Sequence, residues 1–179
     1  FGVAIIAGLY LEKISRVDIN RFYPPDNRIV SDRSEKPLRW FPDINGERHI
    51  WVSLDKISDA TTKAFIAAED QRFFDHIGID PVAMVRALKE NMVQGKIVSG
   101  ASTLTQQMIR ISYPRNRTYS KKFIEVLRSF RAEGHLSKEE ILEVYLNRVP
   151  MGNNLTGVEA ASRIYFTKPS SSLSLHENA

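Results

Sequence analysis

The chain has 179 residues and a mass of 20.4 kDa, enough for one domain with a sizeable core. Hydrophobic residues make up 42% and charged residues 26%, so a wholly disordered chain is excluded. Cysteine is absent, which excludes disulfide bonds, a thiolate metal site and a thiol nucleophile. The net charge of +4 is a small basic excess, so the placement of the charges matters more than their total.

The first eleven residues are uncharged and apolar. As a helix they would rise only about 16 Å, roughly half the thickness of a bilayer core. We interpret residues 1–11 as the C-terminal end of a transmembrane anchor helix, cut short in this sequence. The alternative is a buried N-terminal helix or strand of a soluble domain.

Residues 12–58 are predicted to form an extended juxtamembrane segment, because four prolines between positions 24 and 42 exclude long helices. Aromatic runs at residues 39–41 and 49–52 flank Asn45-Gly46, which is a strong turn signal. The pattern therefore predicts a short β-hairpin whose two strands meet across this turn.

From residue 59 onward the pattern is helical, and residues 59–179 are predicted to form one mainly helical domain. Helix starts are indicated by Asp59, by Asp80-Pro81, by Thr103 and by the capping box that opens at Ser137. A further capping pattern at residues 174–177 would open a helix that cannot finish by Ala179. We therefore expect the natural protein to continue beyond this point.

Glu69 and Asp70 come at the end of an alanine-rich apolar helix segment and are followed by Phe73 and Phe74. A carboxylate in such a position is suited to act as a general base. The alternative is a solvated helix end with the two phenylalanines in the core. His76 is interpreted as a structural histidine, because the four histidines show no metal-ligand spacing.

Residues 100–107 place a glycine, hydroxyls and amides at a predicted helix start. Free N–H groups and the helix dipole make such a start attractive to an anion such as a phosphate. The alternative is an ordinary N-cap with polar surface residues. The segment is not a P-loop, since no Gly-Lys-Ser/Thr follows at the required spacing.

Seven basic residues lie between positions 110 and 131, with Glu125 as the only acid. This cluster fits a di-anionic ligand or acidic lipid headgroups, although a solvated basic helix face is the simpler alternative. Glu125 shares one helical side with Lys121 and Lys122, so it either pairs with them or is a second catalytic carboxylate. Two carboxylates beside a cationic cluster suit glycosyl transfer from a diphosphate donor.

Five ordered blocks of sequence carry a resemblance to a known family. They are Glu69-Asp70 with Phe73, His76 and Gly78; Gly100 to Gln107; Arg117 with Lys121-Lys122 and Glu125; Ser137 to Asn147; and Gly157 with Ala160-Ala161 and Tyr165-Phe166. Together they resemble the bacterial peptidoglycan glycosyltransferase family, which comprises the transglycosylase domain of class A penicillin-binding proteins and the monofunctional transglycosylases.

The resemblance implies a mainly α fold, with a lysozyme-like large lobe, a smaller membrane-proximal jaw lobe and here a short N-terminal β-hairpin. It implies polymerisation of lipid II into β-1,4-linked glycan strands, by inverting transfer from an undecaprenyl-diphosphate donor. Glu69 would be the general base, and Glu125 the second glutamate, which assists the leaving diphosphate or positions the substrate. Alternatives are a lysozyme-like glycan-cleaving hydrolase or lytic enzyme and a non-catalytic module that binds lipid headgroups.

The resemblance also assigns substrate-binding residues, some of which would contact the inhibitor moenomycin: Asp70, Phe73, Gly100, Ser102, Thr103, Gln106, Gln107, Arg110, Arg117, Lys121 and Lys122. A divalent cation, Mg²⁺ or Mn²⁺, is implied as a cofactor, with no ligand assigned and no organic cofactor. The expected location is the bacterial cytoplasmic membrane, with a single-pass anchor and the catalytic domain on the outer face.

The expected partners are lipid II, the growing glycan strand, membrane lipids and other cell-wall synthesis proteins, with no nucleic acid. Two features depart from the family pattern. Thr167 stands where the last block normally has glycine, and Met151 and Asn153-Asn154 follow the fourth block.

Overall fold

The computed structural model describes residues 8, 12–25, 27–34, 37–114 and 118–177. Of the predicted anchor, only Gly8 is among them, so the anchor prediction lies outside the described residues, as does Arg117. Within the described ranges no helix is long and apolar enough to cross a membrane.

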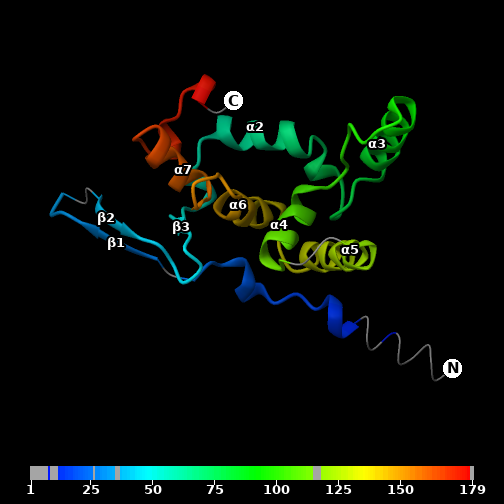
Figure 1. Cartoon of the computed structure of the whole chain (residues 1–179), viewed down its shortest axis with the longest axis horizontal. Helices are drawn as coiled ribbons and strands as arrows, with labels where there is room; N and C mark the ends of the chain where they lie inside the picture. Colours follow the sequence, from blue (N-terminus) through cyan, green and yellow to red (C-terminus); the bar gives the residue numbers. More distant parts are fainter. Residues whose placement is uncertain (1–7, 9–11, 26, 35–36, 115–117, 178–179) are drawn as a thin grey trace.

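The described chain from residue 59 is mainly helical, as predicted (Figure 1). Helices α4 and α6 lie at the centre, while α3 and the strands β1 (Arg28–Ser31) and β2 (Pro37–Phe41) lie at opposite ends of the molecule. The helices are α2 (Asp59–Glu69), α3 (Pro81–Gln94), α4 (Leu104–Ser112), α5 (Tyr119–Glu133), α6 (Lys138–Arg148) and α7 (Val158–Tyr165). Short 3₁₀ turns occur at Ile19–Phe22, Leu54–Lys56, Phe73–Asp75, Ser170–Ser172 and Leu175–Glu177.

Helix α4 is the centre of the core and packs against both α5 and α6. Most residues of α4 are buried, and so are most residues on the side of α6 that packs against it. The removal of these side chains from water is the main term that stabilises the arrangement. The core is formed chiefly by Phe22, Phe73, Leu104, Met108, Ile109, Ile141, Leu142, Val144, Tyr145 and Leu146. The polar start of α4 is thus held on a rigid base.

Capping residues set most helix starts where they were predicted. The Asp80 carboxylate accepts hydrogen bonds from the N–H groups of Val82 and Ala83, and Pro81 opens α3. Thr103 caps α4, and Ser137 forms a complete capping box on α6. The start of α2 was misplaced by one residue, because Ser58, not Asp59, accepts the capping N–H.

The predicted β-hairpin is wrong in its strand pairing. The turn at Asn45-Gly46 exists, and Asp43 N–H donates to the Glu47 carbonyl at 2.8 Å. The strands on its two sides do not pair with each other, however. Instead β2 (Pro37–Phe41) pairs antiparallel with β1 (Arg28–Ser31), and β3 (Arg48–His49) pairs in parallel with β4 (Leu155–Thr156). The second pair joins the N-terminal segment to the loop before α7.

The departures from the family pattern coincide with unusual backbone conformations. Thr167 has φ +61°, and Asn153 and Asn154 have φ +50° and +57°. Glycine adopts this left-handed region at little cost and asparagine tolerates it, whereas a β-branched threonine is strained there. Thr167 therefore keeps a conformation suited to the glycine whose place it takes.

Candidate active site

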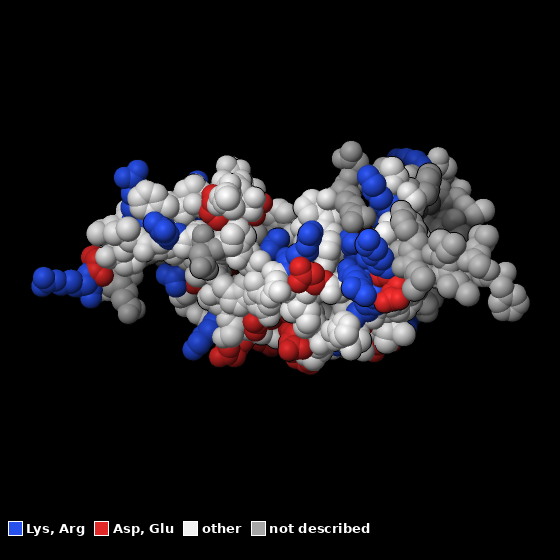
Figure 2. All heavy atoms as spheres, turned by 90° about the horizontal axis from the view of Figure 1, so that it is seen from below, with Lys and Arg blue, Asp and Glu red and all other residues white. Residues whose placement is uncertain are grey.

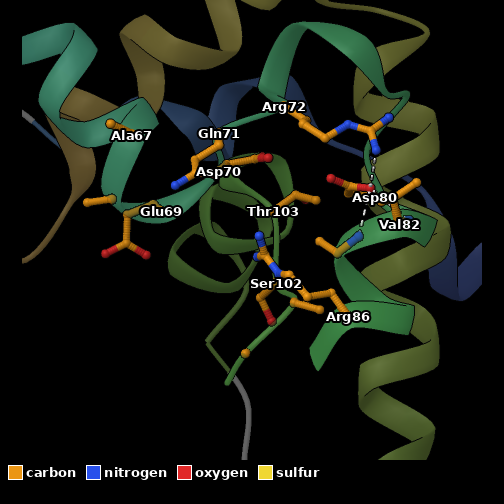
Figure 3. Close-up of a pocket in the computed structure, with 14 residues that line it drawn as sticks. Ala67, Glu69, Asp70, Gln71, Arg72, Asp80, Val82, Arg86, Ser102 and Thr103 are labelled. Atoms are coloured by element: carbon orange, nitrogen blue, oxygen red, sulfur yellow. Dashed lines mark hydrogen bonds and ion pairs between the residues drawn. The ribbon is translucent and has the colours of Figure 1, made fainter. Parts of the chain in front are cut away.

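Glu69 is the last residue of α2, and its exposed carboxylate stands at the edge of a pocket (Figure 3). The pocket lies between the end of α2, the start of α3 and the loop that leads into α4. Ser102 and Thr103 form the wall contributed by that loop. The structure therefore brings the first two sequence blocks together, although 21 residues, 79–99, separate them in the chain.

Asp70 clamps the end of α2 to the start of α4. Its buried carboxylate accepts the Leu104 N–H at 3.0 Å and lies 3.0 Å from His76 Nε2. His76 thus has the structural role that was predicted. Because Asp70 occupies an N–H group at the start of α4, the anion at this helix terminus is the protein's own carboxylate. Asp70 therefore has a structural role at this helix start, and its contact with substrate stays a prediction.

Gln107, on α4, holds the Glu69 carboxylate at the end of α2. Its Nε2 donates to Glu69 Oε2 at 2.7 Å, while its Oε1 lies 3.4 Å from the Tyr145 hydroxyl. Burial raises the pKa of Tyr145, and the nearby charge of Glu69 raises it further against the opposing effect of Arg110. One carboxylate oxygen of Glu69 is thereby held, and the side chain remains exposed.

Lys122 joins α5 to the start of α4. Its ammonium donates to Ser102 Oγ at 3.0 Å, to Gln106 Oε1 at 2.8 Å and to Glu125 Oε1 at 2.6 Å. Arg110 Nε lies 3.9 Å from the other oxygen of Glu125. Ser102 therefore belongs both to the pocket beside Glu69 and to the cluster around Glu125. The two predicted catalytic glutamates are thus both linked to the start of α4: Glu69 through Gln107, and Glu125 through Lys122.

The other predicted binding residues in the described chain differ in how far they are buried. Phe73 and Thr103 are buried: Phe73 is part of the core, and Thr103 Oγ1 donates to the Gly78 carbonyl at 2.7 Å. Phe73 thus supports the site from the core, whereas Thr103 also lines the pocket itself. Gly100 is exposed and lines the pocket, and Lys121 is half-buried on α5.

The basic cluster predicted between residues 110 and 131 divides into two parts. Arg110 and Lys122 lie at the site, whereas Arg128 and Arg131 donate to the carbonyls of Ile14 and Glu12 at 2.7 and 3.1 Å. The last two therefore attach the N-terminal segment to α5. Figure 2 shows that basic side chains gather on this face of the molecule, with a few acidic groups among them.

Two arginines of the pocket were missed from the sequence. Arg86 extends from α3 into the pocket toward Ser102 (Figure 3). Arg72 Nη1 lies 3.8 Å from Asp80 Oδ1. Burial acts to raise the pKa of Asp80, but the Ala83 N–H and the Arg72 guanidinium outweigh it, so this pKa is lowered. Both arginines lie in or near the first sequence block, but their spacing alone gives no signal for a shared pocket.

The divalent cation implied by the resemblance has no evident ligand set in the described part of the chain. No three His, Asp or Glu side chains come together there in a way that could hold a metal ion. Glu69 and Glu125 are each held by amide or cationic groups instead. No chemical step is therefore assigned to a metal.

In this mainly helical domain, two glutamates and several cations thus converge on one polar helix start. The family described as transglycosylase matches residues 34–179. The chain therefore belongs to the transglycosylase family, which confirms the resemblance carried by the five sequence blocks, and it is an enzyme domain of the peptidoglycan glycosyltransferase type.

Three relatives illustrate the similarity. Penicillin-binding protein 1A of Aquifex aeolicus (strain VF5) is 42% identical over 142 residues, which cover 79% of this chain and 20% of the relative. The biosynthetic peptidoglycan transglycosylases of Thiobacillus denitrificans and Nitrosomonas eutropha are 41% and 37% identical, over 74% and 88% of this chain. The chain spans 57% and 65% of those two proteins.

Proposed function

We propose that this domain polymerises lipid II into β-1,4-linked glycan, by inverting transfer from an undecaprenyl-diphosphate donor. The observation that carries the proposal is that two glutamates with different surroundings lie at the same helix start. Glu69 is exposed beside a pocket with one oxygen held by Gln107, and Glu125 lies among cations. A base on one side and a cationic site for a leaving anion on the other are what this transfer needs.

In the proposed step, the acceptor 4-hydroxyl attacks C1 of the donor sugar. A new C1–O bond forms, and the bond from C1 to the diphosphate oxygen breaks with its electron pair leaving on the diphosphate. The hydroxyl proton passes to Glu69. Since Gln107 engages Oε2, the other carboxylate oxygen is the one available for this proton.

Lys122 and Arg110 are proposed to stabilise the departing diphosphate. An ammonium group has three N–H donors, and all three of Lys122 already have protein partners. A diphosphate oxygen must therefore replace one of them, and the neutral acceptors Ser102 and Gln106 are easier to displace than charged Glu125. Glu125 would then keep Lys122 in place while the substrate binds.

Replacement of Lys122 by alanine is expected to weaken donor binding about tenfold or more, because it removes a charge-assisted hydrogen bond to the diphosphate. Binding of lipid II or moenomycin to the variant, measured at increasing salt, checks the prediction. The wild-type affinity should fall with salt more steeply than that of the variant. Lys63→Ala is the control, because Lys63 is exposed and pairs with Asp59 on α2. Equal affinity in wild type and Lys122→Ala would remove the proposed diphosphate role.

A glycan-cleaving hydrolase is the second candidate, and the cations around Glu125 argue against it, because hydrolysis releases no diphosphate. Incubation with labelled lipid II distinguishes the two. Long glycan strands with released undecaprenyl diphosphate support polymerisation, whereas cleavage of preformed glycan with no strand growth would favour the hydrolase. A module that only binds headgroups would bring about neither reaction.

The proposed contact with the membrane has support in α3. Its residues Val85, Leu88 and Met92 face outward, and each is more than half exposed. Further exposed apolar side chains lie on α3 and just after it: Val82, Met84, Val93, Ile97 and Val98. Such a surface is typical of contact with another apolar phase, and a lipid-linked substrate supplies one.

The double replacement Leu88→Asp with Met92→Asp is expected to lower partitioning of the protein onto phospholipid vesicles about tenfold or more, because two apolar side chains no longer enter the lipid. Co-sedimentation with vesicles of phosphatidylglycerol and phosphatidylethanolamine measures it. Ile44→Asp is the matched control, since Ile44 is 89% exposed but lies in the turn before β3. Unchanged partitioning of the double variant would show that α3 does not contact the membrane.

A further inference from the structure

Tyr145 is a buried residue of α6 whose hydroxyl reaches the active site through one intermediate. It lies in the core with 1% of its surface exposed, and its hydroxyl is 3.4 Å from Gln107 Oε1. The other end of the same amide donates to Glu69 at 2.7 Å. We propose that Tyr145 is a positioning residue for the general base: it orients the Gln107 amide so that the NH₂ group faces the Glu69 carboxylate. This inference rests on the proposed function, in which Glu69 accepts the proton.

The orientation of the amide follows from the donor capacity of its two neighbours. An ionised carboxylate only accepts hydrogen bonds, so Glu69 requires the NH₂ end of Gln107. The amide oxygen then faces Tyr145, whose hydroxyl can donate to it. Without this hydroxyl, the amide could turn by 180° and present its oxygen to Glu69. Two acceptors would then face each other, which favours the protonated form of the carboxyl group.

The surroundings of Tyr145 keep its hydroxyl a donor. Burial raises the pKa of the phenol, and the Glu69 charge raises it further, so the proton is retained throughout the working pH range. The ring is held independently, because it packs edge-on against Phe65 with the ring centroids 6.1 Å apart. Loss of the hydroxyl alone should therefore leave the core in place.

Glu69 has several charged neighbours besides this contact. Asp70 follows it in the chain, Arg72 and Arg86 line the same pocket, and Arg110 lies one turn beyond Gln107 on α4. None of these groups contacts the Gln107 amide in the described structure. A change of the Tyr145 hydroxyl therefore alters the environment of Glu69 through the amide and leaves these charges in place.

The test is the pH dependence of lipid II polymerisation by Tyr145→Phe. The half-point of the acidic limb of kcat is expected to move up by about one pH unit, with about a tenfold loss of kcat on that limb and little change in KM. Gln107→Met removes the amide from a half-buried surface position and should shift the limb as far. In the Gln107→Met background, Tyr145→Phe should add nothing further.

Tyr113→Phe is the matched control, because Tyr113 is also buried but its hydroxyl contacts the backbone of Asp18. It should leave the acidic limb unchanged. An unshifted limb in Tyr145→Phe would overturn the positioning role; if that variant does not fold, an unshifted limb in Gln107→Met overturns it instead. Additive shifts in the double variant would also contradict it. Absence of polymerisation by the wild type would instead remove the proposed function, so the two failures are distinguishable.

Discussion

Glu69→Gln is expected to lower the rate of glycan polymerisation by about 10²- to 10⁴-fold while lipid II still binds. The amide has the shape of the carboxylate but cannot take the acceptor proton, so the loss falls on the transition state. The side chain is exposed and is held by Gln107, with which an amide can also form a hydrogen bond. The fold should therefore be unaffected.

Turnover of labelled lipid II and binding of the same substrate, measured on one preparation, check this prediction. Glu139→Gln serves as the control, because Glu139 is an exposed glutamate in the first turn of α6. Parallel loss of binding and turnover in Glu69→Gln would assign Glu69 to substrate binding. Full turnover would show that another group is the base.

Gly157→Ala is expected to destabilise the domain by about 2–5 kcal/mol and to lower its Tm by about 10 °C. Gly157 has φ +86°, and an added Cβ would lie 2.6 Å from the Asn147 carbonyl oxygen. Asn147 has little freedom to move away, because its side chain bonds the N–H and the carbonyl of Val52 at 2.9 and 2.8 Å. Both the backbone strain and the steric conflict therefore remain in the folded state.

Thermal unfolding of the two alanine variants Gly157→Ala and Gly134→Ala measures this effect against a matched control. Gly134 ends α5 with an ordinary φ of −82°, and the nearest atom to an added Cβ is 3.4 Å away. Its replacement should shift the Tm by only a few degrees. A similar Tm for wild type and Gly157→Ala would mean that the turn before α7 rearranges freely.

The helices could be predicted from the sequence because their starts depend on local hydrogen bonds. Asp80, Thr103 and Ser137 each accept from N–H groups two or three residues ahead, so the pattern and the structure concern the same short segment. The strands could not be predicted in this way. Arg48 pairs with Leu155, far along the chain, and a local turn signal carries no information about such a partner.

The sequence predicted which residues form the site better than it predicted the contacts that position them. Glu69, Gln107, Lys122 and Glu125 were all proposed from the sequence blocks, and the structure brings them to one helix start. The contribution of Tyr145 was missed, because it depends on how α6 packs against α4. Such packing is decided by side-chain shapes across two helices and leaves no spacing signal in the sequence.

The contact that Asp70 makes between α2 and α4 also marks the base of the segment that carries α3. The chain leaves this contact after Gly78 and returns to it at Thr103, whose hydroxyl bonds the Gly78 carbonyl. Residues 79–102, which include α3, therefore form a long segment whose two ends are held together by this hydrogen bond. Its length can change at little thermodynamic cost, since doubling a loop adds only about 0.6 kcal/mol of closure entropy. The exposed outer side of this segment can therefore vary with the lipid that it is proposed to contact, while Arg86 and Ser102 at its base keep the pocket beside Glu69.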